Sequence, residues 1–422
     1  MRANLFAALI GMLCVAGCGG GSDIAGGGGG GGGGSTGNVQ SIIVDSGPSV
    51  VANSPTPAIN TAYTTVTICA PGSTSVCQTI DHIQVDTGSA GLRILSEVLT
   101  ISLPVQNDTA GNVIAECVPF VDGSSWGPIR QADVKIAGET ALNQEVQVIG
   151  DTSYTVPNTC TGTSSGAGAG LEDTVAKFGA NGILGVAPYV SDCGSACTVQ
   201  SNSTYYTCAT ATTCAQSAMA ENLQVSNPVA AFTTDNNGVI IQLPAVPTSG
   251  SASVTGSLIF GVGTQSNNGL GSATVFNLDS NGFLATGYKL ASTLHYAFID
   301  SGSNGYYFHD PSIAPCTTNT GFYCPPSDQA LQANIINPVN NASKMVSFTV
   351  TNADSLFKNA KTAIGATSGL AGDSHSFGDG TNGSIPGDQA FDWGLPFHYG
   401  KSVFVVIEGK TTASGTGPFF AF

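Results

Sequence analysis

The stretch Ile80-Asp81-His82-Ile83-Gln84-Val85-Asp86-Thr87-Gly88-Ser89 predicts a strand that ends in a carboxylate, a small hydroxyl residue and a glycine. The pattern returns in Ala297-Phe298-Ile299-Asp300-Ser301-Gly302-Ser303, where the aspartate comes 214 residues after the first. A carboxylate at the end of a buried strand is costly unless hydrogen bonds or a nearby charge compensate it. The two turns therefore indicate two lobes, each contributing one aspartate to a shared site.

The residues beside each aspartate suit a shared site. Gly88 and Gly302 permit a tight turn and a close approach of two backbones. The short hydroxyls that can bond to the carboxylates or to the facing loop are Thr87, Ser89, Ser301 and Ser303. We expect Asp86 and Asp300 to form a dyad that shares one proton. The alternative is a pair of surface turns, since these residue types are common in turns generally.

Two later runs end in glycine, Ile183-Leu184-Gly185 and Asp392-Trp393-Gly394. Together with the aspartate turns they resemble the pepsin-type aspartic peptidases, and specifically a bacterial family of predicted lipoproteins grouped as a domain of unknown function. In pepsin-like lobes an apolar-apolar-glycine segment completes each turn. The resemblance therefore assigns a supporting role to Ile183, Leu184, Gly185 and Gly394. Asp392 departs from the pattern, because an apolar residue is expected there.

The resemblance covers roughly residues 60–422. It implies an all-β fold, a bilobal pepsin-like double β-barrel with a few short helices. It also implies a β-hairpin flap, which in the family closes over substrate and ends in Tyr-Gly. Trp126-Gly127 falls 40 residues after Asp86, at the place of that pair, so we expect both residues to contact substrate. Trp126 can donate a hydrogen bond through its indole N–H but cannot accept one as a tyrosine hydroxyl can. The alternative to contact with substrate is that Trp126 is a hydrophobic anchor within a hairpin.

Composition agrees with two lobes built from strands. The chain has 422 residues, of which 41% are hydrophobic and only 9% charged, and 56 glycines. This length predicts two domains or lobes, and the composition favours strands and turns over a helical bundle. A formal net charge of −16 makes nucleic acid and anionic membrane surfaces poor partners for the folded part, because both require clustered Lys and Arg.

Residues 1–18 are predicted to be a signal peptide. Arg2 is the positive end, residues 5–16 form an apolar run too short to span a bilayer, and Val15-Ala16-Gly17-Cys18 resembles a bacterial lipobox. That resemblance implies lipidation of Cys18, and the Gly19 that follows implies sorting to the outer membrane. The alternative is an ordinary signal peptide with an incidental cysteine. No later segment reads as a transmembrane helix.

A glycine-rich tether follows the signal peptide. Residues 19–37 include an unbroken run of nine glycines, which has no side chains to form a core. We expect an N-terminal lobe over 38–246, containing Asp86, the flap and a cysteine-rich insertion over residues 190–220. A C-terminal lobe over 247–422 would contain Asp300.

Ten cysteines remain after Cys14 leaves with the signal peptide and Cys18 is lipidated. In an exported chain this even number favours disulfides over zinc, which is the alternative for the insertion. Cys69 with Cys77 and Cys316 with Cys324 are plausible local pairs, and Cys117 with Cys160 is a looser one. The pairing of Cys193, Cys197, Cys208 and Cys214 is left open. We expect no metal and no cofactor, because the five histidines show no paired metal-ligand spacing.

The leading functional hypothesis is a lipid-anchored aspartic endopeptidase of the bacterial cell envelope. Asp86 and Asp300 would activate one water, with one carboxyl ionised and the other protonated, and mildly acidic activity would follow. One alternative is a catalytically weak or inactive lipoprotein of the same fold that binds a peptide or another envelope ligand. A third hypothesis is cleavage of only itself or a single partner. The expected partners are a peptide or protein substrate and, through Cys18, the membrane; we expect a monomer.

Overall fold

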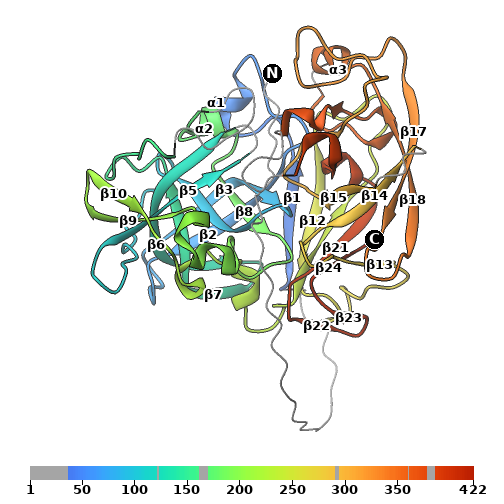
Figure 1. Cartoon of the computed structure of the whole chain (residues 1–422). Helices are drawn as coiled ribbons and strands as arrows, with labels where there is room; N and C mark the ends of the chain where they lie inside the picture. The colour runs from blue at the N-terminus through green and yellow to red at the C-terminus, as the bar shows by residue number, and fades with distance from the viewer. Residues whose placement is uncertain (1–36, 121–122, 161–169, 290–293, 360, 378–384) are drawn as a thin grey trace.

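The computed structural model describes residues 37–120, 123–160, 170–289, 294–359, 361–377 and 385–422 (Figure 1). The predicted signal peptide, the lipidation site Cys18 and all but the last residue of the predicted tether lie outside these residues. Among the described residues, none of the helices has the length and apolarity needed to span a bilayer.

The described residues form a mostly β protein with only short helices, and its two halves stand side by side in Figure 1. The first half contains β1 (Val39–Val44), α1 (Ser49–Ala52), β2 (Ala62–Cys69), β3 (Cys77–Asp86), β4 (Ala90–Leu95), β5 (Val113–Pro119), β6 (Ser124–Ile136), β7 (Glu139–Ile149), α2 (Val175–Phe178), β8 (Gly182–Val186), β9 (Tyr205–Thr210), β10 (Thr213–Gln216) and β11 (Gly238–Leu243). Its short 3-10 helices are η1 (Gly194–Thr198), η2 (Gln200–Asn202), η3 (Glu221–Leu223) and η4 (Pro228–Ala231).

The second half continues the same architecture. Its strands and α-helix are β12 (Val254–Phe260), β13 (Val275–Asn277), β14 (Leu284–Tyr288), β15 (His295–Ile299), β16 (Tyr306–Phe308), β17 (Gln329–Ile336), β18 (Ser343–Val350), α3 (Ala353–Lys358), β19 (Ala371–Gly372), β20 (Ala390–Trp393), β21 (Lys401–Val406), β22 (Thr411–Thr412), β23 (Gly415–Thr416) and β24 (Phe419–Ala421). Its short 3-10 helices are η5 (Ala366–Ser368), η6 (Ser374–Phe377), η8 (Gly387–Gln389) and η9 (Leu395–Phe397).

Two large sheets carry the fold. A 15-stranded sheet has the order β10-β9-β5-β6-β7-β4-β8-β3-β2-β1-β12-β11-β21-β24-β13, and a 7-stranded sheet has the order β18-β17-β14-β15-β20-β16-β19. The first sheet crosses from one half to the other, because β1 pairs with β12 over its whole length. The predicted lobe boundary at 246 and 247 falls in the loop between β11 and β12, which are paired strands of this sheet, and it stays a prediction.

Each aspartate turn lies in the same local arrangement of three strands. In the first half β3 runs parallel to β8, and β8 pairs antiparallel with β4. In the second half β15 runs parallel to β20, and β20 pairs antiparallel with β16. The last four residues of β3, Ile83–Asp86, are all buried, as expected for a parallel strand covered on both faces. The repeat predicted from sequence is thus a repeat of structure.

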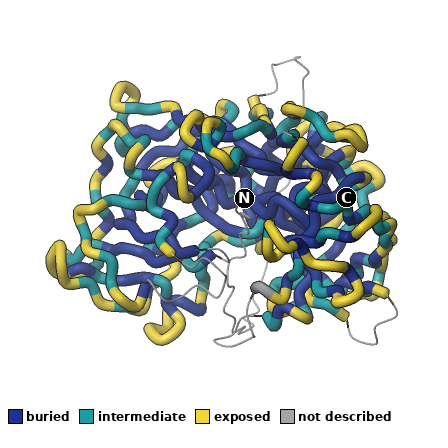
Figure 2. Tube along the Cα trace, turned by 90° about the horizontal axis from the view of Figure 1, so that it is seen from above, coloured by how far each residue is buried: buried dark blue, intermediate teal, exposed yellow. Residues whose placement is uncertain are grey.

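The apolar core extends through both halves. The largest cluster of buried side chains includes Val85 and Leu184 from the first half and Ile299 and Trp393 from the second. Figure 2 shows buried segments through the middle of the molecule and exposed loops around its rim. The two aspartate turns are therefore supported by one shared core.

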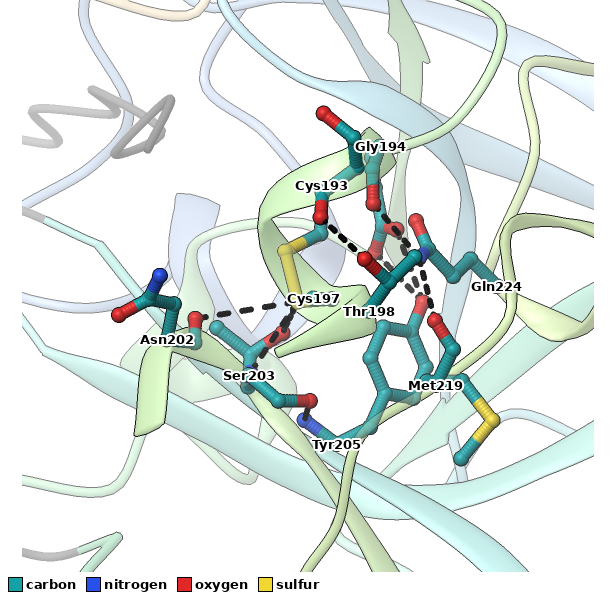
Figure 3. Close-up of a disulfide and its surroundings, with 12 residues drawn as sticks. Cys193, Gly194, Cys197, Thr198, Asn202, Ser203, Tyr205, Met219 and Gln224 are labelled. Atoms are coloured by element: carbon teal, nitrogen blue, oxygen red, sulfur yellow. Dashed lines mark hydrogen bonds between the residues drawn. A yellow bond between two sulfur atoms is a disulfide. The ribbon is translucent and has the colours of Figure 1, made fainter. Parts of the chain in front are cut away.

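Five disulfides connect the ten predicted cysteines. Three pairs were expected and are confirmed: Cys69–Cys77, Cys117–Cys160 and Cys316–Cys324. In the insertion, Cys193 pairs with Cys197 within four residues and Cys208 pairs with Cys214 across the β9–β10 hairpin. Figure 3 shows the Cys193–Cys197 bond beside Met219, whose N–H donates to the Cys197 carbonyl at 2.7 Å.

Candidate active site

The two aspartates lie at the ends of strands β3 and β15, in the buried centre of the molecule. Asp86 is the last residue of β3 and lies in register with Gly185 of β8. Asp300 follows β15, and its N–H donates to the carbonyl of Trp393 at 3.1 Å. Gly394 comes directly after Trp393, the last residue of β20, so each aspartate has a glycine beside it on the neighbouring strand or at its end.

The two turns are joined by four reciprocal hydrogen bonds. The Thr87 hydroxyl donates to the carbonyl of Ile299 at 2.7 Å and accepts from the Ser301 N–H at 2.9 Å. The Ser301 hydroxyl donates to the carbonyl of Val85 at 2.8 Å and accepts from the Thr87 N–H at 3.1 Å. Because every donor and acceptor is buried and paired, this exchange holds the two turns at a defined separation.

Each carboxyl group receives the same pair of donors. The N–H of Gly88 donates to Asp86 Oδ1 at 2.7 Å, and the Ser89 hydroxyl donates to Oδ2. In the second turn, Gly302 N–H donates to Asp300 Oδ1 at 2.7 Å and the Ser303 hydroxyl donates to Oδ2 at 2.8 Å. These donors orient both carboxyl groups and leave them room to interact with each other.

The glycines of the turns make the close approach possible. A Cβ on Gly88 would lie 2.8 Å from Asp300 Oδ1, and a Cβ on Gly302 would lie 2.6 Å from Asp86 Oδ1. The two carboxyl groups interact directly, and each shifts the pKa of the other. Any larger residue at either glycine would displace the opposite carboxyl group.

The electrostatic surroundings make the two aspartates unequal. Both are completely buried, and burial raises the pKa of each. For Asp86 this rise is opposed by hydrogen bonds, the first from Asp300, and by the positive charge of Arg93. For Asp300 the negative charge of Asp86 adds to burial, so its pKa lies well above the ordinary value. The pair titrates as a unit, and the charge of Arg93 favours the arrangement in which Asp86 carries the negative charge and Asp300 the shared proton.

The segments expected to support the dyad lie beside it. A Cβ on Gly185 would come within 2.6 Å of the Ser89 carbonyl oxygen, and one on Gly394 within 2.0 Å of the Gly305 carbonyl oxygen. Ile183 and Leu184 are fully buried, in two different apolar clusters. Both glycines are thus required by close backbone contact.

Trp126 and Gly127 lie on the predicted hairpin, where Cys117 of β5 pairs with Trp126 of β6. The Trp126 indole is only 2% exposed and contacts Tyr206 edge to face at 5.3 Å. Its N–H donates to the carbonyl of Tyr154 at 3.0 Å. The side chain therefore offers neither an exposed face nor a free donor to a substrate, and the hydrophobic-anchor alternative describes it. A Cβ on Gly127 would lie 1.9 Å from the Val148 carbonyl oxygen, so this glycine is packed against β7.

Two further polar side chains connect the halves at the site, and sequence reasoning missed both. Gln84 donates to the carbonyl of Gly302 at 2.9 Å. Asn60 donates to the carbonyl of Asn304 at 2.9 Å and accepts from the Ile364 N–H at 2.7 Å. A polar Gln84 within an otherwise apolar strand end was a usable signal, whereas nothing in the local sequence distinguishes Asn60.

Two lobes that each present an aspartate turn, joined through Thr87 and Ser301, define an all-β protein of the bilobal pepsin-like fold. The chain belongs to the DUF3443 family, described as a protein of unknown function, whose family model matches residues 34–422. Among solved structures it is similar to the aspartic proteinase from Irpex lacteus, at 15% identity and a TM-score of 0.48, over 91% of this chain and 96% of that one. A comparison with curated proteins finds no match.

Proposed function

We propose that the protein is an aspartic endopeptidase, held in the bacterial cell envelope by a lipid on Cys18 and directed to the outer membrane. The observation that supports the enzymatic part is the reciprocal bonding of Thr87 and Ser301, which brings two equivalently bonded carboxyl groups together. A buried acid pair of this kind is costly to maintain, and its use in catalysis accounts for the cost. The substrate class is a peptide or protein.

The unequal carboxyl groups assign the roles. Asp86, ionised, removes a proton from a water molecule as the water oxygen bonds to the scissile carbonyl carbon. The proton of Asp300 passes at the same time to the carbonyl oxygen, which gives a neutral tetrahedral diol. The proton now on Asp86 then passes to the amide nitrogen, the carbon–nitrogen bond breaks, and Asp300 takes a proton from one hydroxyl. Both carboxyl groups return to their starting states.

Purified protein lacking residues 1–37 tests the catalytic proposal by cleavage of a denatured protein. We expect Asp86→Asn and Asp300→Asn to lower the rate at least about 100-fold, because each removes a proton-transfer group. Asp328→Asn, at an exposed carboxylate, is the matched control and should cleave normally. Equal rates in all four proteins would exclude the mechanism.

Activity should need ionised Asp86 and protonated Asp300. Since the pKa of each is raised, the active pH range should lie above the pH at which an ordinary aspartate ionises.

A second candidate function is ligand binding without cleavage, and complete burial of both carboxyl groups favours it. A peptide that contains a central statine-type hydroxyl distinguishes the two functions. If the dyad is catalytically competent, binding should be tight and should depend on both Asp86 and Asp300. If the site only binds, a peptide should bind equally to the wild type and to both asparagine variants.

A further inference from the structure

Asp392 is a third carboxyl group beside the dyad, in a position where the other lobe has an apolar residue. The parallel pairing of β3 with β8 sets Gln84 opposite Ile183, and that of β15 with β20 sets Phe298 opposite Asp392. Asp392 thus occupies in the second lobe the place of Ile183 in the first. It is completely buried, and neither carboxyl oxygen has a partner at normal hydrogen-bond geometry.

The surroundings of Asp392 disfavour a negative charge. Its cross-strand neighbours Phe298 and Tyr307 belong to an apolar cluster on this side of the sheet. The ionised group that acts on it is Asp86, which repels an anion. Burial above all raises the pKa of Asp392 well above its ordinary value, and the charge of Asp86 raises it further, while the Ser303 hydroxyl opposes the shift. No cation acts on Asp392 among these groups, so the neutral acid is the stable form.

The Ser303 hydroxyl acts on the Asp392 carboxyl group and is also bonded to the dyad. A serine hydroxyl has one proton to donate and two lone pairs to accept with. The Ser303 proton is already directed to Asp300 Oδ2 at 2.8 Å. The Ser303 oxygen can therefore only accept a hydrogen bond from Asp392. A carboxyl group can donate such a bond only when it is protonated.

We propose that Asp392 is a positioning residue of the site, a protonated carboxyl group that donates to the Ser303 oxygen and thereby holds the Ser303 proton on Asp300. The hydrogen bonds then run in one direction, from Asp392 to Ser303 and from Ser303 to Asp300. Each donor in such a chain is strengthened by the bond it accepts. If Asp392 ionised, the Ser303 proton would turn towards it, and Asp300 would lose a donor.

Infrared difference spectroscopy at neutral pH tests the protonation without any need for activity. The wild-type spectrum minus that of Asp392→Asn should contain the carbonyl stretch of a protonated carboxylic acid. In a Ser303→Ala background the same difference band should move to higher frequency, because the acid loses its acceptor. Asp328→Asn, at an exposed position, is the control and should remove carboxylate bands instead.

Two results would overturn the proposal. Carboxylate bands in the Asp392 difference spectrum would mean that the group is ionised, and an unshifted acid band in the Ser303→Ala background would mean that Ser303 is not its acceptor. If Asp392→Asn does not fold, Asp392→Ile, which copies Ile183, gives the same difference spectrum.

The kinetic consequence rests on the proposed peptidase function. Asp392→Asn keeps a donor for Ser303 and should retain kcat, whereas Asp392→Leu has no donor and should lower kcat about 10-fold with KM unchanged. Equal kcat in the two variants would contradict the positioning role. An inactive wild type would instead exclude the peptidase proposal, while the infrared result would still decide the state of Asp392.

Discussion

At the centre of the molecule, Thr87 and Ser301 exchange hydrogen bonds in such a way that each turn gives the other both a donor and an acceptor. The hydroxyl of Ser301 donates to the Val85 carbonyl in β3, and the hydroxyl of Thr87 donates to the Ile299 carbonyl at the end of β15. Both side chains are almost completely buried, at 2% exposure or less. Loss of one hydroxyl would therefore leave buried groups without a partner, and water could not readily replace it.

Thr87→Val tests this at the scale of one residue. Valine has nearly the shape of threonine but would leave the Ser301 N–H and the Ile299 carbonyl unpaired, so we expect the free energy of unfolding to fall by at least about 2 kcal/mol. Urea denaturation measures the change. Thr87→Ser keeps the hydroxyl and should lose much less; a valine variant as stable as the serine variant would show that the exchange contributes little.

At the scale of elements, the hairpin of β5 and β6 is held on both sides. β5 pairs with β9 of the insertion, and β6 pairs with β7 and with β2. Beneath it, the buried Arg93 of β4 contacts Asp192 of the insertion at 2.7 Å and Glu116 of β5 at 3.4 Å. The insertion thus fastens the predicted flap to the strand that follows the Asp86 turn.

Asp192→Ala should weaken this attachment. It leaves the Arg93 guanidinium with only Glu116 as a charged partner in this buried cluster, so we expect a loss of about 3 kcal/mol in the free energy of unfolding. The comparison is Asp173→Ala, which removes the more exposed ion pair with Lys177 and should change stability by less than about 1 kcal/mol. Similar losses in both variants would mean that burial of the Arg93 cluster adds nothing to its contribution.

At the scale of the whole molecule, β1 joins the two halves. It pairs with β12 along six residues and with β2 at its end, and Ile42 and Val44 are completely buried in the shared core. Asn60 adds a second connection, because its side chain bonds to the backbone of Asn304 and Ile364. The halves are therefore expected to unfold together.

Two truncated proteins distinguish the contribution of β1 to stability from that of the segment before it. A protein that begins at residue 38 retains every strand of the large sheet, whereas one that begins at residue 45 lacks β1. Loss of the burial of Ile42 and Val44 should cost about 3–6 kcal/mol and lower the thermal midpoint. Calorimetry of both proteins provides the measurement, and equal midpoints would show that β1 is not needed to hold the halves together.

The sequence by itself predicted the two aspartate turns and the disulfides Cys69–Cys77 and Cys316–Cys324, because these features depend on short local patterns. The glycine partners Gly185 and Gly394 came from the family resemblance, and the Cys117–Cys160 pair, 43 residues apart, was a looser prediction. The fold class followed from the family resemblance that those repeated patterns carry, and within that resemblance Asp392 stood out as a polar residue in an apolar place. A local pattern also places Trp126 on a hairpin, but it does not say which way the indole points.

Only the tertiary structure decided the remaining features, since they depend on residues far apart in the chain. Tyr206 of the insertion packs against Trp126, and the Arg93 cluster combines residues from three separate segments of the chain. The unequal character of Asp86 and Asp300 likewise comes from Arg93, whose charge acts on Asp86, within a site that burial has removed from water. Charges act through space in a buried site, and the order of residues along the chain does not reveal that distance.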